Sequence, residues 1–257
     1  MTRRESSYVV VDEALAPGEV DLLLADIGAA CRDDEPATIH RAHGDRPLHY
    51  RVIDGDRVAR ALPGVDALLE RFLPDAARWY GSTLVPLRKS AVAVNVNITP
   101  PGGTYRWHYD RNVVTVLLYL NVVAGGAIEV CPGYRVELPA RWALPRVQAA
   151  LDGLLRARPL RRWLGRPITI EPHPGRMVMM RGRRCLHSVR PVEPGSADRT
   201  VVVLSFDPPT RALDPGAALD RYLYDERAIA DGDPNYDGGA TARARPIRRR
   251  ASAPSGP

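Results

Sequence analysis

The chain has 257 residues, of which 45% are hydrophobic and 26% are charged, so it can build a hydrophobic core and disorder of the whole chain is not expected. The net charge of +6 comes mostly from residues 241–257, which hold five arginines and no acid, because the rest of the chain has 31 basic and 30 acidic side chains. This near-neutral body gives no electrostatic sign of a nucleic-acid partner. Three cysteines are too few for a disulfide framework, which predicts a reducing, cytoplasmic location.

The N-terminal third predicts one strand and two helices. Residues 8–11 are typical of a short strand, and apolar residues then recur at helical spacing after Pro17, which suits the first turn of a helix. A second amphipathic pattern begins near Pro63 and resumes after Pro74, where we expect a break or a kink. Both helices are expected to cover one face of a sheet.

From residue 87 onward the pattern changes to that of strands. Apolar side chains from Val92 to Ile98 alternate with a polar-to-small face that carries Asn95 and Asn97. Further strands are predicted at residues 105–110, 113–121, 127–131, 168–171, 177–180 and 200–206, separated by glycine and proline clusters. This order predicts a mainly β fold with supporting helices: a double-stranded β-helix (a jelly-roll, cupin-like barrel) with the N-terminal helices packed on one sheet.

The predicted organisation is a single fold with additions. Residues 1–86 supply the N-terminal strand and support helices, and residues 87–210 form the barrel, with a helical insertion at about 139–167. Residues 211–230 are expected to hold a C-terminal helix, and the Arg/Pro-rich residues 231–257 are expected to be disordered. The insertion has two interpretations, a packed cover or a substrate-facing flap whose arginines attract an anionic group.

One cluster of residues carries recognisable chemistry. On an extended strand, the side chains of His108 and Asp110 fall on the same face, and His187 follows a later predicted strand. Two histidines and one carboxylate on neighbouring strands can form a facial triad that leaves metal positions open. Arg199 opens the last predicted strand, where a guanidinium could pair bidentately with a carboxylate inside the barrel.

Taken together, His108-x-Asp110, His187 and Arg199 resemble the Fe(II)- and 2-oxoglutarate-dependent dioxygenase superfamily, in particular its prolyl-hydroxylase-like and phytanoyl-CoA-hydroxylase-like members, over roughly residues 91–207. The glycine pair at residues 125–126 and the Pro-Gly at residues 174–175 resemble further motifs of these enzymes. The resemblance implies that the catalytic residues His108, Asp110 and His187 ligate Fe(II), that Arg199 holds the distal carboxylate of the cosubstrate 2-oxoglutarate, and that O2 is consumed.

The sequence departs from the family at the cosubstrate site. The tyrosine that often lies nine residues before the first histidine is Thr99 here, and the Arg-x-Ser pair of other branches reads Arg199-Thr200-Val201. We expect Asn95 and Asn97 to take over part of the contact with the cosubstrate. Candidate substrate-binding residues flank the metal motif: Tyr105, Arg106 and Arg111.

The resemblance implies hydroxylation, or a related C–H oxidation, coupled to decarboxylation of 2-oxoglutarate. We expect a small-molecule substrate in bacterial secondary metabolism or amino-acid modification, with no nucleic-acid partner; the oligomeric state stays open. Alternatives are a nucleic-acid demethylase, although Ser205 stands where those enzymes usually carry a second arginine, a peptidyl hydroxylase, or a non-catalytic cupin-like binding barrel. No membrane association is expected, because the longest apolar run, residues 113–128, is interrupted by polar residues and glycines.

Overall fold

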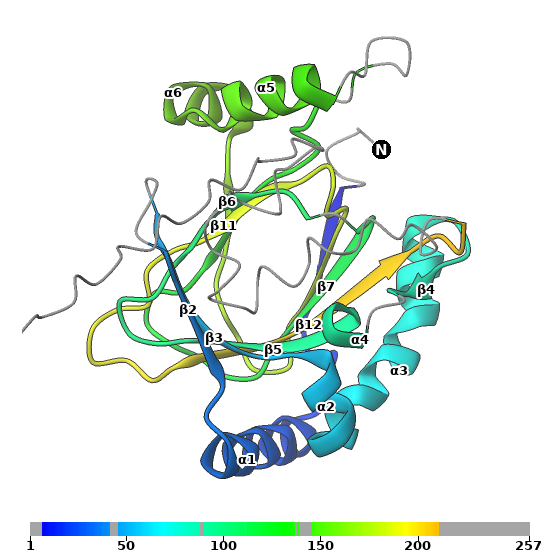
Figure 1. Cartoon of the computed structure of the whole chain (residues 1–257), viewed down its shortest axis with the longest axis vertical. Helices are drawn as coiled ribbons and strands as arrows, with labels where there is room; N and C mark the ends of the chain where they lie inside the picture. Colours follow the sequence, from blue (N-terminus) through cyan, green and yellow to red (C-terminus); the bar gives the residue numbers. More distant parts are fainter. Residues whose placement is uncertain are drawn as a thin grey trace, which may run out of the picture.

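Two antiparallel sheets face each other in a computed structural model of the chain (Figure 1), which describes residues 7–41, 46–87, 90–110, 112–136, 138 and 145–210. The larger sheet has the strand order β1-β10-β7-β12-β5-β3-β2, with β4 paired to β12. The smaller sheet has the order β6-β11-β8-β9. The helix predicted at 211–230, the tail at 231–257 and Arg111 lie outside the described residues.

The strand bounds are as follows. The larger sheet consists of β1 (Tyr8–Val11), β2 (Ala37–Arg41), β3 (Leu48–Ile53), β4 (Val85–Pro86), β5 (Val94–Thr99), β7 (Val114–Tyr119), β10 (Met177–Met180) and β12 (Arg199–Asp207). The smaller sheet consists of β6 (Tyr105–His108), β8 (Ile128–Cys131), β9 (Ile168–Ile170) and β11 (Leu186–Val189).

The N-terminal helices cover the outer face of the larger sheet, as predicted (Figure 1). They are α1 (Pro17–Asp33), α2 (Gly55–Ala61) and α3 (Pro63–Tyr80). Helix α1 buries Val20, Leu23 and Ile27 at helical spacing, and burial of each such side chain contributes about 1.5–3 kcal/mol. Helix α3 is continuous through Pro74, so the alternative of a break there is wrong.

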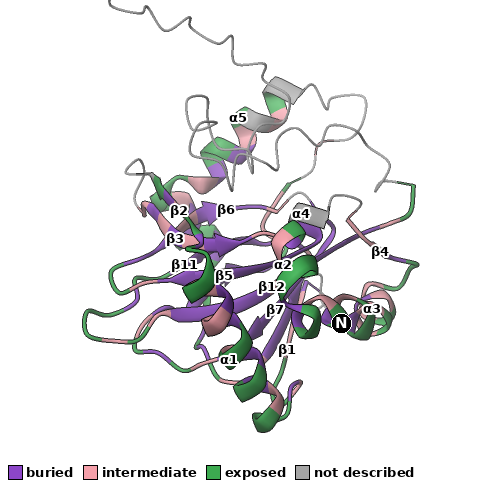
Figure 2. Ribbon diagram, turned by 60° about the horizontal axis from the view of Figure 1, so that its bottom comes forward, coloured by how far each residue is buried: buried purple, intermediate pink, exposed green. Residues whose placement is uncertain are grey.

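Strand β12 shows how the larger sheet divides the molecule into two layers. Val202, Leu204 and Phe206 pack against the helices, whereas Val201, between them in sequence, joins the cluster enclosed by the two sheets. Figure 2 shows that the strands of both sheets are largely buried, while α1 and α3 include exposed residues. Polar residues that share the face of Val201 therefore point into the barrel.

A third layer covers the outer face of the smaller sheet. Helices α5 (Pro145–Arg156) and α6 (Arg158–Leu160) and the π-helical turn η1 (Arg161–Gly165) lie above β6 and β11 (Figure 1). The Arg161 guanidinium lies over the Trp107 ring, and a Cβ atom at Gly165 would lie 2.9 Å from Cys131 Sγ, so this turn packs closely on β8. These contacts favour the packed-cover interpretation of the insertion. No helix among the described residues combines the length and apolar character needed to cross a bilayer.

Two differences from the predicted boundaries bear on the interior of the barrel. The strand expected to begin at Val92 begins at Val94, because α4 (Ser90–Ala93) forms one helical turn before it. The strand expected at 105–110 ends at His108, so Asp110 lies in the loop that follows. Strands β2, β3, β4 and β11 and helix α2 complete the fold and were not predicted as separate elements.

Candidate metal centre

The two histidines of the predicted triad face each other across a strand pair. His108 on β6 is the direct partner of His187 on β11, and their ring centroids are 4.0 Å apart. Directly opposed residues of antiparallel strands project from the same face of a sheet. Both side chains are buried, so the pairing of β6 with β11 brings two imidazoles together between the sheets.

Asp110 completes the cluster from the loop after β6. Its Oδ1 lies 3.3 Å from His108 Nε2 and 3.5 Å from His187 Nε2, and the three possible ligand atoms lie within 4.8 Å of one another. The Asp110 N–H donates to the carbonyl of Gly182 over 3.1 Å. The convergence predicted from the His-x-Asp spacing is therefore present, although backbone contacts rather than a continuous strand produce it.

The other carboxylate oxygen of Asp110 is held from the larger sheet. The Thr115 hydroxyl on β7 donates to Asp110 Oδ2, and the Asn112 amide donates to Thr115 Oγ1 over 2.9 Å. Sequence reasoning missed both partners, although Thr115 is a polar residue within an otherwise apolar strand. They fix the carboxylate so that Oδ1 stays directed at the histidines.

The protonation states suit a divalent metal ion. His108 Nδ1 lies 2.9 Å from the Arg106 carbonyl, and His187 Nδ1 lies 3.0 Å from the Cys185 carbonyl. A carbonyl accepts a hydrogen bond only from a protonated nitrogen, which leaves each Nε2 lone pair available to a metal. Burial, with the neighbouring His108 imidazole, lowers the pKa of His187 to about 4, so the His187 ring is neutral at physiological pH.

Asp110 is ionised in the same cluster. Burial by itself would raise its pKa, but the neighbouring imidazoles of His187 and His108 and the hydrogen bond from Thr115 outweigh burial and lower the pKa well below its ordinary value. One carboxylate and two imidazoles make the donor set that a non-haem Fe(II) centre uses. The residues present therefore fit a ferrous ion, and among the described residues they form the one group of this kind.

Gly182 makes room for the Asp110 loop. A Cβ atom at this position would lie 2.7 Å from Asp110 Cβ, 2.8 Å from the Asn112 carbonyl oxygen and 2.9 Å from Thr115 Oγ1. Real Cβ atoms do not approach backbone so closely, so any side chain at Gly182 would displace the loop.

We therefore expect Gly182→Ala to weaken metal binding by about tenfold, the cost of disturbing a group that orients a ligand. Titration with Mn2+ would measure the effect. Gly153→Ala is the matched control, because no heavy atom lies within 4 Å of the corresponding Cβ position. Equal Mn2+ affinity in the two variants would show that the Gly182 contact does not position Asp110.

Arg199 lies at the first position of β12 and is buried. Its guanidinium carbon is 5.0 Å from the centroid of the Tyr119 ring, and its Nε has no hydrogen-bond partner among the described residues. Gly126, at φ +65°, lies against it, and a Cβ there would come within 2.8 Å of Arg199 Cδ. A buried guanidinium with an unpaired N–H group can donate hydrogen bonds to the carboxylate of a small ligand.

Tyr119 was not predicted as a site residue. It lies on β7 as the direct partner of Val201, two residues from Arg199 and on the same face of the sheet. Burial raises the pKa of its hydroxyl against the opposing charge of Arg199, so the phenol is a neutral hydrogen-bonding group. Its sequence signal was weak, because every residue of β7 is buried and the strand reads as continuous core.

The two asparagines also face the interior. Asn97 on β5 is the direct partner of Val201, and Asn95 is the partner of Val203. The side-chain oxygens of both asparagines are buried without a hydrogen-bond partner among the described residues. This placement on the face that carries Arg199 was predicted from the alternation of β5.

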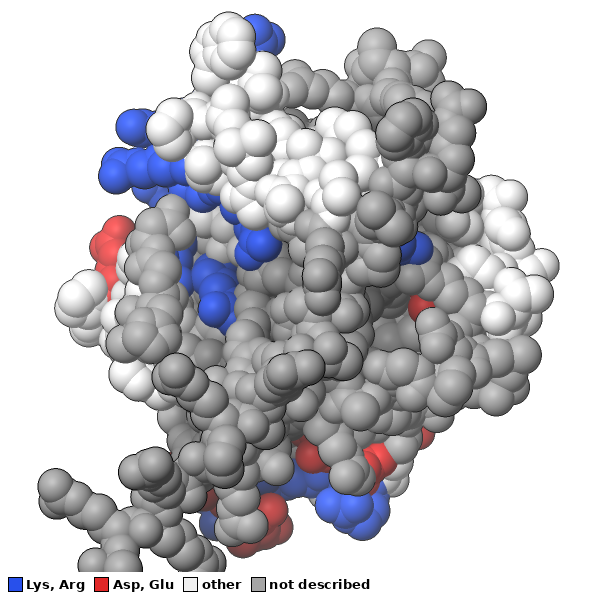
Figure 3. All heavy atoms as spheres, turned by 45° about the horizontal axis from the view of Figure 1, so that its top comes forward, with Lys and Arg blue, Asp and Glu red and all other residues white. Residues whose placement is uncertain are grey.

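The candidate substrate residues flank the metal cluster. The Tyr105 ring lies 4.5 Å from the His108 ring and 5.0 Å from the Tyr50 ring, between centroids. Arg106, also on β6, is half-buried, and its carbonyl orients His108. Figure 3 shows arginine side chains beside and inside a hollow next to the insertion, while most acidic side chains on this face lie near its edges.

Comparison with known proteins agrees with this geometry. The sequence profile of the 2OG-Fe(II) oxygenase superfamily matches residues 94–206, whereas no curated protein sequence matches the chain. The solved structure of the epimerase SnoN, in complex with Fe3+, alpha ketoglutarate and nogalamycin RO, superposes with a TM-score of 0.59 at 17% identity, covering 84% of this chain and 89% of SnoN.

Two further structures show the same fold. The carbocyclase SnoK from nogalamycin biosynthesis gives a TM-score of 0.59 at 15% identity and covers 79% of this chain and 80% of its own. A prolyl hydroxylase from Trichoplax adhaerens, bound to a peptide of hypoxia inducible factor, gives 0.53 at 19% identity and covers 81% and 87%. The double-stranded β-helix prediction is confirmed. The profile spans the strands from β5 to β12, so the barrel that carries the triad is similar to those of the 2OG-Fe(II) oxygenase superfamily, and this similarity indicates an iron- and 2-oxoglutarate-dependent oxygenase.

Proposed function

We propose that this oxygenase hydroxylates a small molecule, or oxidises one of its C–H bonds in a related way, at a centre formed by His108, Asp110 and His187. The observation that carries the proposal is the meeting of these three side chains, within 4.8 Å of one another, inside a barrel that also buries Arg199. When bound there, Fe(II) supplies the chemistry that joins dioxygen activation to decarboxylation of 2-oxoglutarate.

The residues around the metal have separate tasks in this proposal. Arg199 pairs with the distal carboxylate of 2-oxoglutarate, and the Tyr119 hydroxyl beside it donates a second hydrogen bond. Asn95 and Asn97, with their buried side-chain oxygens, complete the polar wall of that subsite. The apolar cluster between the sheets, which includes Val201, excludes water from the reacting atoms.

A small-molecule substrate is favoured over the alternatives. SnoK and SnoN are enzymes of nogalamycin biosynthesis, and the near-neutral body lacks the broad positive charge that nucleic-acid binding needs. Tyr105, beside His108, and Arg106 on the same strand are proposed to contact the substrate, and the arginines in the hollow of Figure 3 favour one that carries a negative charge. We place the reaction in the cytoplasm, since the three cysteines form no disulfide.

Peptidyl hydroxylation is the second candidate. The prolyl hydroxylase from Trichoplax adhaerens, solved with a peptide, shares the fold. Succinate formation in the presence of proline-containing peptides separates this activity from small-molecule oxidation.

The test is succinate formation from 2-oxoglutarate by the whole chain. With Fe(II) and air we expect slow formation in the absence of substrate, an increase when an accepted small molecule is added, and none under nitrogen or with a chelator. An increase in succinate formation on addition of proline-containing peptides would instead support peptidyl hydroxylation. Failure to form succinate under any condition, together with no measurable Mn2+ binding, would favour a non-catalytic binding barrel.

A further inference from the structure

The strand that presents His108 is weakly held by its sheet. Strand β6 is four residues long and forms the edge of the smaller sheet, so among the described strands only β11 pairs with it. That pairing has a register shift between His187 and Val189. A short edge strand with an irregular ladder has few backbone hydrogen bonds to fix its position.

Side chains on the other face of β6 supply further contacts. Trp107 and Tyr109 flank His108 in sequence and belong to a buried cluster with Cys131 and Leu186. The Arg161 guanidinium carbon lies 4.3 Å from the Trp107 ring centroid, and that of Arg135 lies 5.4 Å from the Tyr109 ring centroid. Each neighbour of His108 is thus covered by a guanidinium.

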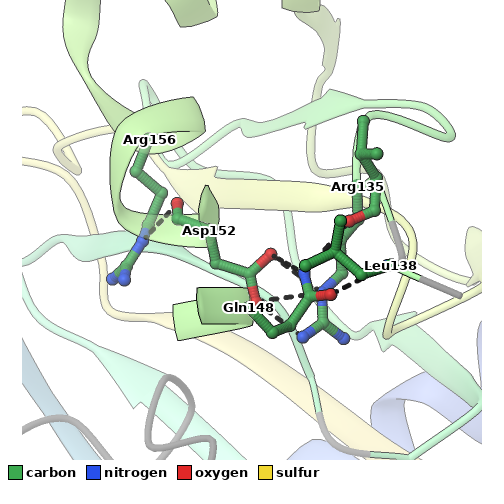
Figure 4. A network of polar contacts seen from close by, with 6 residues as sticks. Arg135, Leu138, Gln148, Asp152 and Arg156 are labelled. Carbon is green, nitrogen blue, oxygen red and sulfur yellow. Dashed lines mark hydrogen bonds and ion pairs between the residues drawn. The ribbon is translucent and has the colours of Figure 1, made fainter. Parts of the chain in front are cut away.

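The Arg135 guanidinium over Tyr109 is held by a partly buried polar network (Figure 4). Arg135 pairs with both oxygens of Asp152 on α5, with Nε–Oδ1 at 3.0 Å and Nη2–Oδ2 at 2.6 Å. The Gln148 amide donates to Asp152 Oδ1 over 3.0 Å, and its carbonyl oxygen accepts from the Leu138 N–H over 3.0 Å. The carboxylate therefore ties α5 to the chain segment after β8.

The contacts of Arg161, which lies over Trp107, also connect to Asp152. The Asp152 carbonyl accepts from Arg156 Nε over 3.1 Å, and the Arg156 carbonyl accepts from Arg161 Nη1 over 2.8 Å. Asp152 is only 5% exposed although it carries a charge. The Asp152 carboxylate thus holds Arg135, and the main-chain carbonyl of Asp152 begins a chain of contacts that reaches Arg161. A third guanidinium, that of Arg46, also lies over Trp107, 5.2 Å from its ring centroid.

We infer that Asp152 is a positioning residue for the metal centre, and that the insertion α5–α6–η1 acts as a clamp on strand β6. Through Arg135 and Arg161 it holds Tyr109 and Trp107, and so fixes His108 between them. This inference rests on the proposed role of His108 as a metal ligand. It gives the insertion a function that depends on contact with the outer face of the sheet and not on contact with substrate.

The test compares Mn2+ dissociation constants, measured from the free-Mn2+ electron paramagnetic resonance signal with the full chain. Asp152→Asn and Arg161→Gln are each expected to weaken Mn2+ binding by about tenfold, as loss of an outer support of a metal ligand does. Arg161→Lys, which keeps the cation over Trp107, is expected to restore most of the affinity. Leu23→Ala in α1 is the control for general destabilisation, because it loosens the helical layer and does not touch β6.

The outcomes separate the clamp from the metal site itself. Mn2+ affinity within twofold of wild type in both Asp152→Asn and Arg161→Gln overturns the clamp, as does an equal loss in Leu23→Ala. If circular dichroism shows that Asp152→Asn does not fold, the Mn2+ affinities of Arg161→Gln and Arg161→Lys test the clamp instead. Wild-type protein that does not bind Mn2+, or His108→Ala that binds it normally, would instead refute the proposed metal site and the clamp with it.

Discussion

Replacing Asp110 with alanine is expected to weaken Mn2+ binding by more than about 100-fold, because loss of a mere supporting partner of a metal ligand already costs about 10- to 100-fold. The substitution removes the one anionic donor from a cluster whose other donors are His108 and the neutral His187. Succinate formation with saturating Fe(II) and 2-oxoglutarate is expected to fall to the background without enzyme. Titration calorimetry and succinate detection measure the two effects.

Two further variants make this result specific. Asp110→Asn keeps the shape and the hydrogen bond from Thr115 but removes the charge, so it separates the loss of a ligand from a collapse of the loop. Asp12→Ala removes an exposed carboxylate that pairs with Arg176 and does not belong to the metal cluster. This variant should leave both Mn2+ affinity and succinate formation unchanged. Undiminished Mn2+ affinity in Asp110→Ala would remove this residue from the metal site.

Arg199→Met is expected to raise the KM for 2-oxoglutarate by about 30-fold or more, since loss of one partner of a buried, hydrogen-bonded charge pair costs about 2–5 kcal/mol. Methionine fills similar volume but offers no donor to the carboxylate beside Tyr119. Arg199→Lys keeps the charge without the planar fork and should give an intermediate KM. The measurement is the rate of succinate formation against 2-oxoglutarate concentration.

The matched control for Arg199 is Arg190→Met. Arg190 is exposed and lies just after β11, so its replacement changes the net charge equally without entering the barrel. The proposed cosubstrate site would be wrong if the two variants had the same KM for 2-oxoglutarate, or if Mn2+ affinity fell in Arg199→Met as it does in Asp110→Ala.

Much of the fold was predictable because local patterns and tertiary contacts agree in it. Helix α1 begins at Pro17 and buries residues at helical spacing, and strands β8 and β10 are short, largely apolar runs bounded by glycine and proline. The segment of β2 and β3 was missed because its strands are stabilised by non-local pairing: Val52 of β3 pairs with Asn97 of β5, far along the chain. Alternation alone also did not separate the turn of α4 from β5, because Val92 is buried in either conformation.

The candidate site was predictable where the chemistry depends on residue type and spacing. The residue types and spacing of His108, Asp110 and His187 indicate a set of metal ligands. Arg199 is recognisable as a cation within an apolar strand. Tyr119 was not predicted, because its role depends on the register of β7 with β12, which no local pattern specifies. The contacts of Asp152 were unpredictable for the same reason, since they join an insertion helix to Arg135 before it.

The alternation along β12 has a consequence for laboratory evolution of substrate range. Val201 and Val203 face the barrel interior beside Arg199, whereas Val202 and Leu204 pack against the helical layer. Libraries that vary Val201 and Val203 can therefore change the side chains inside the barrel while Arg199 and the side chains that pack against the helices stay untouched. Residues that can be varied to change specificity thus alternate along β12 with residues that stabilise the fold.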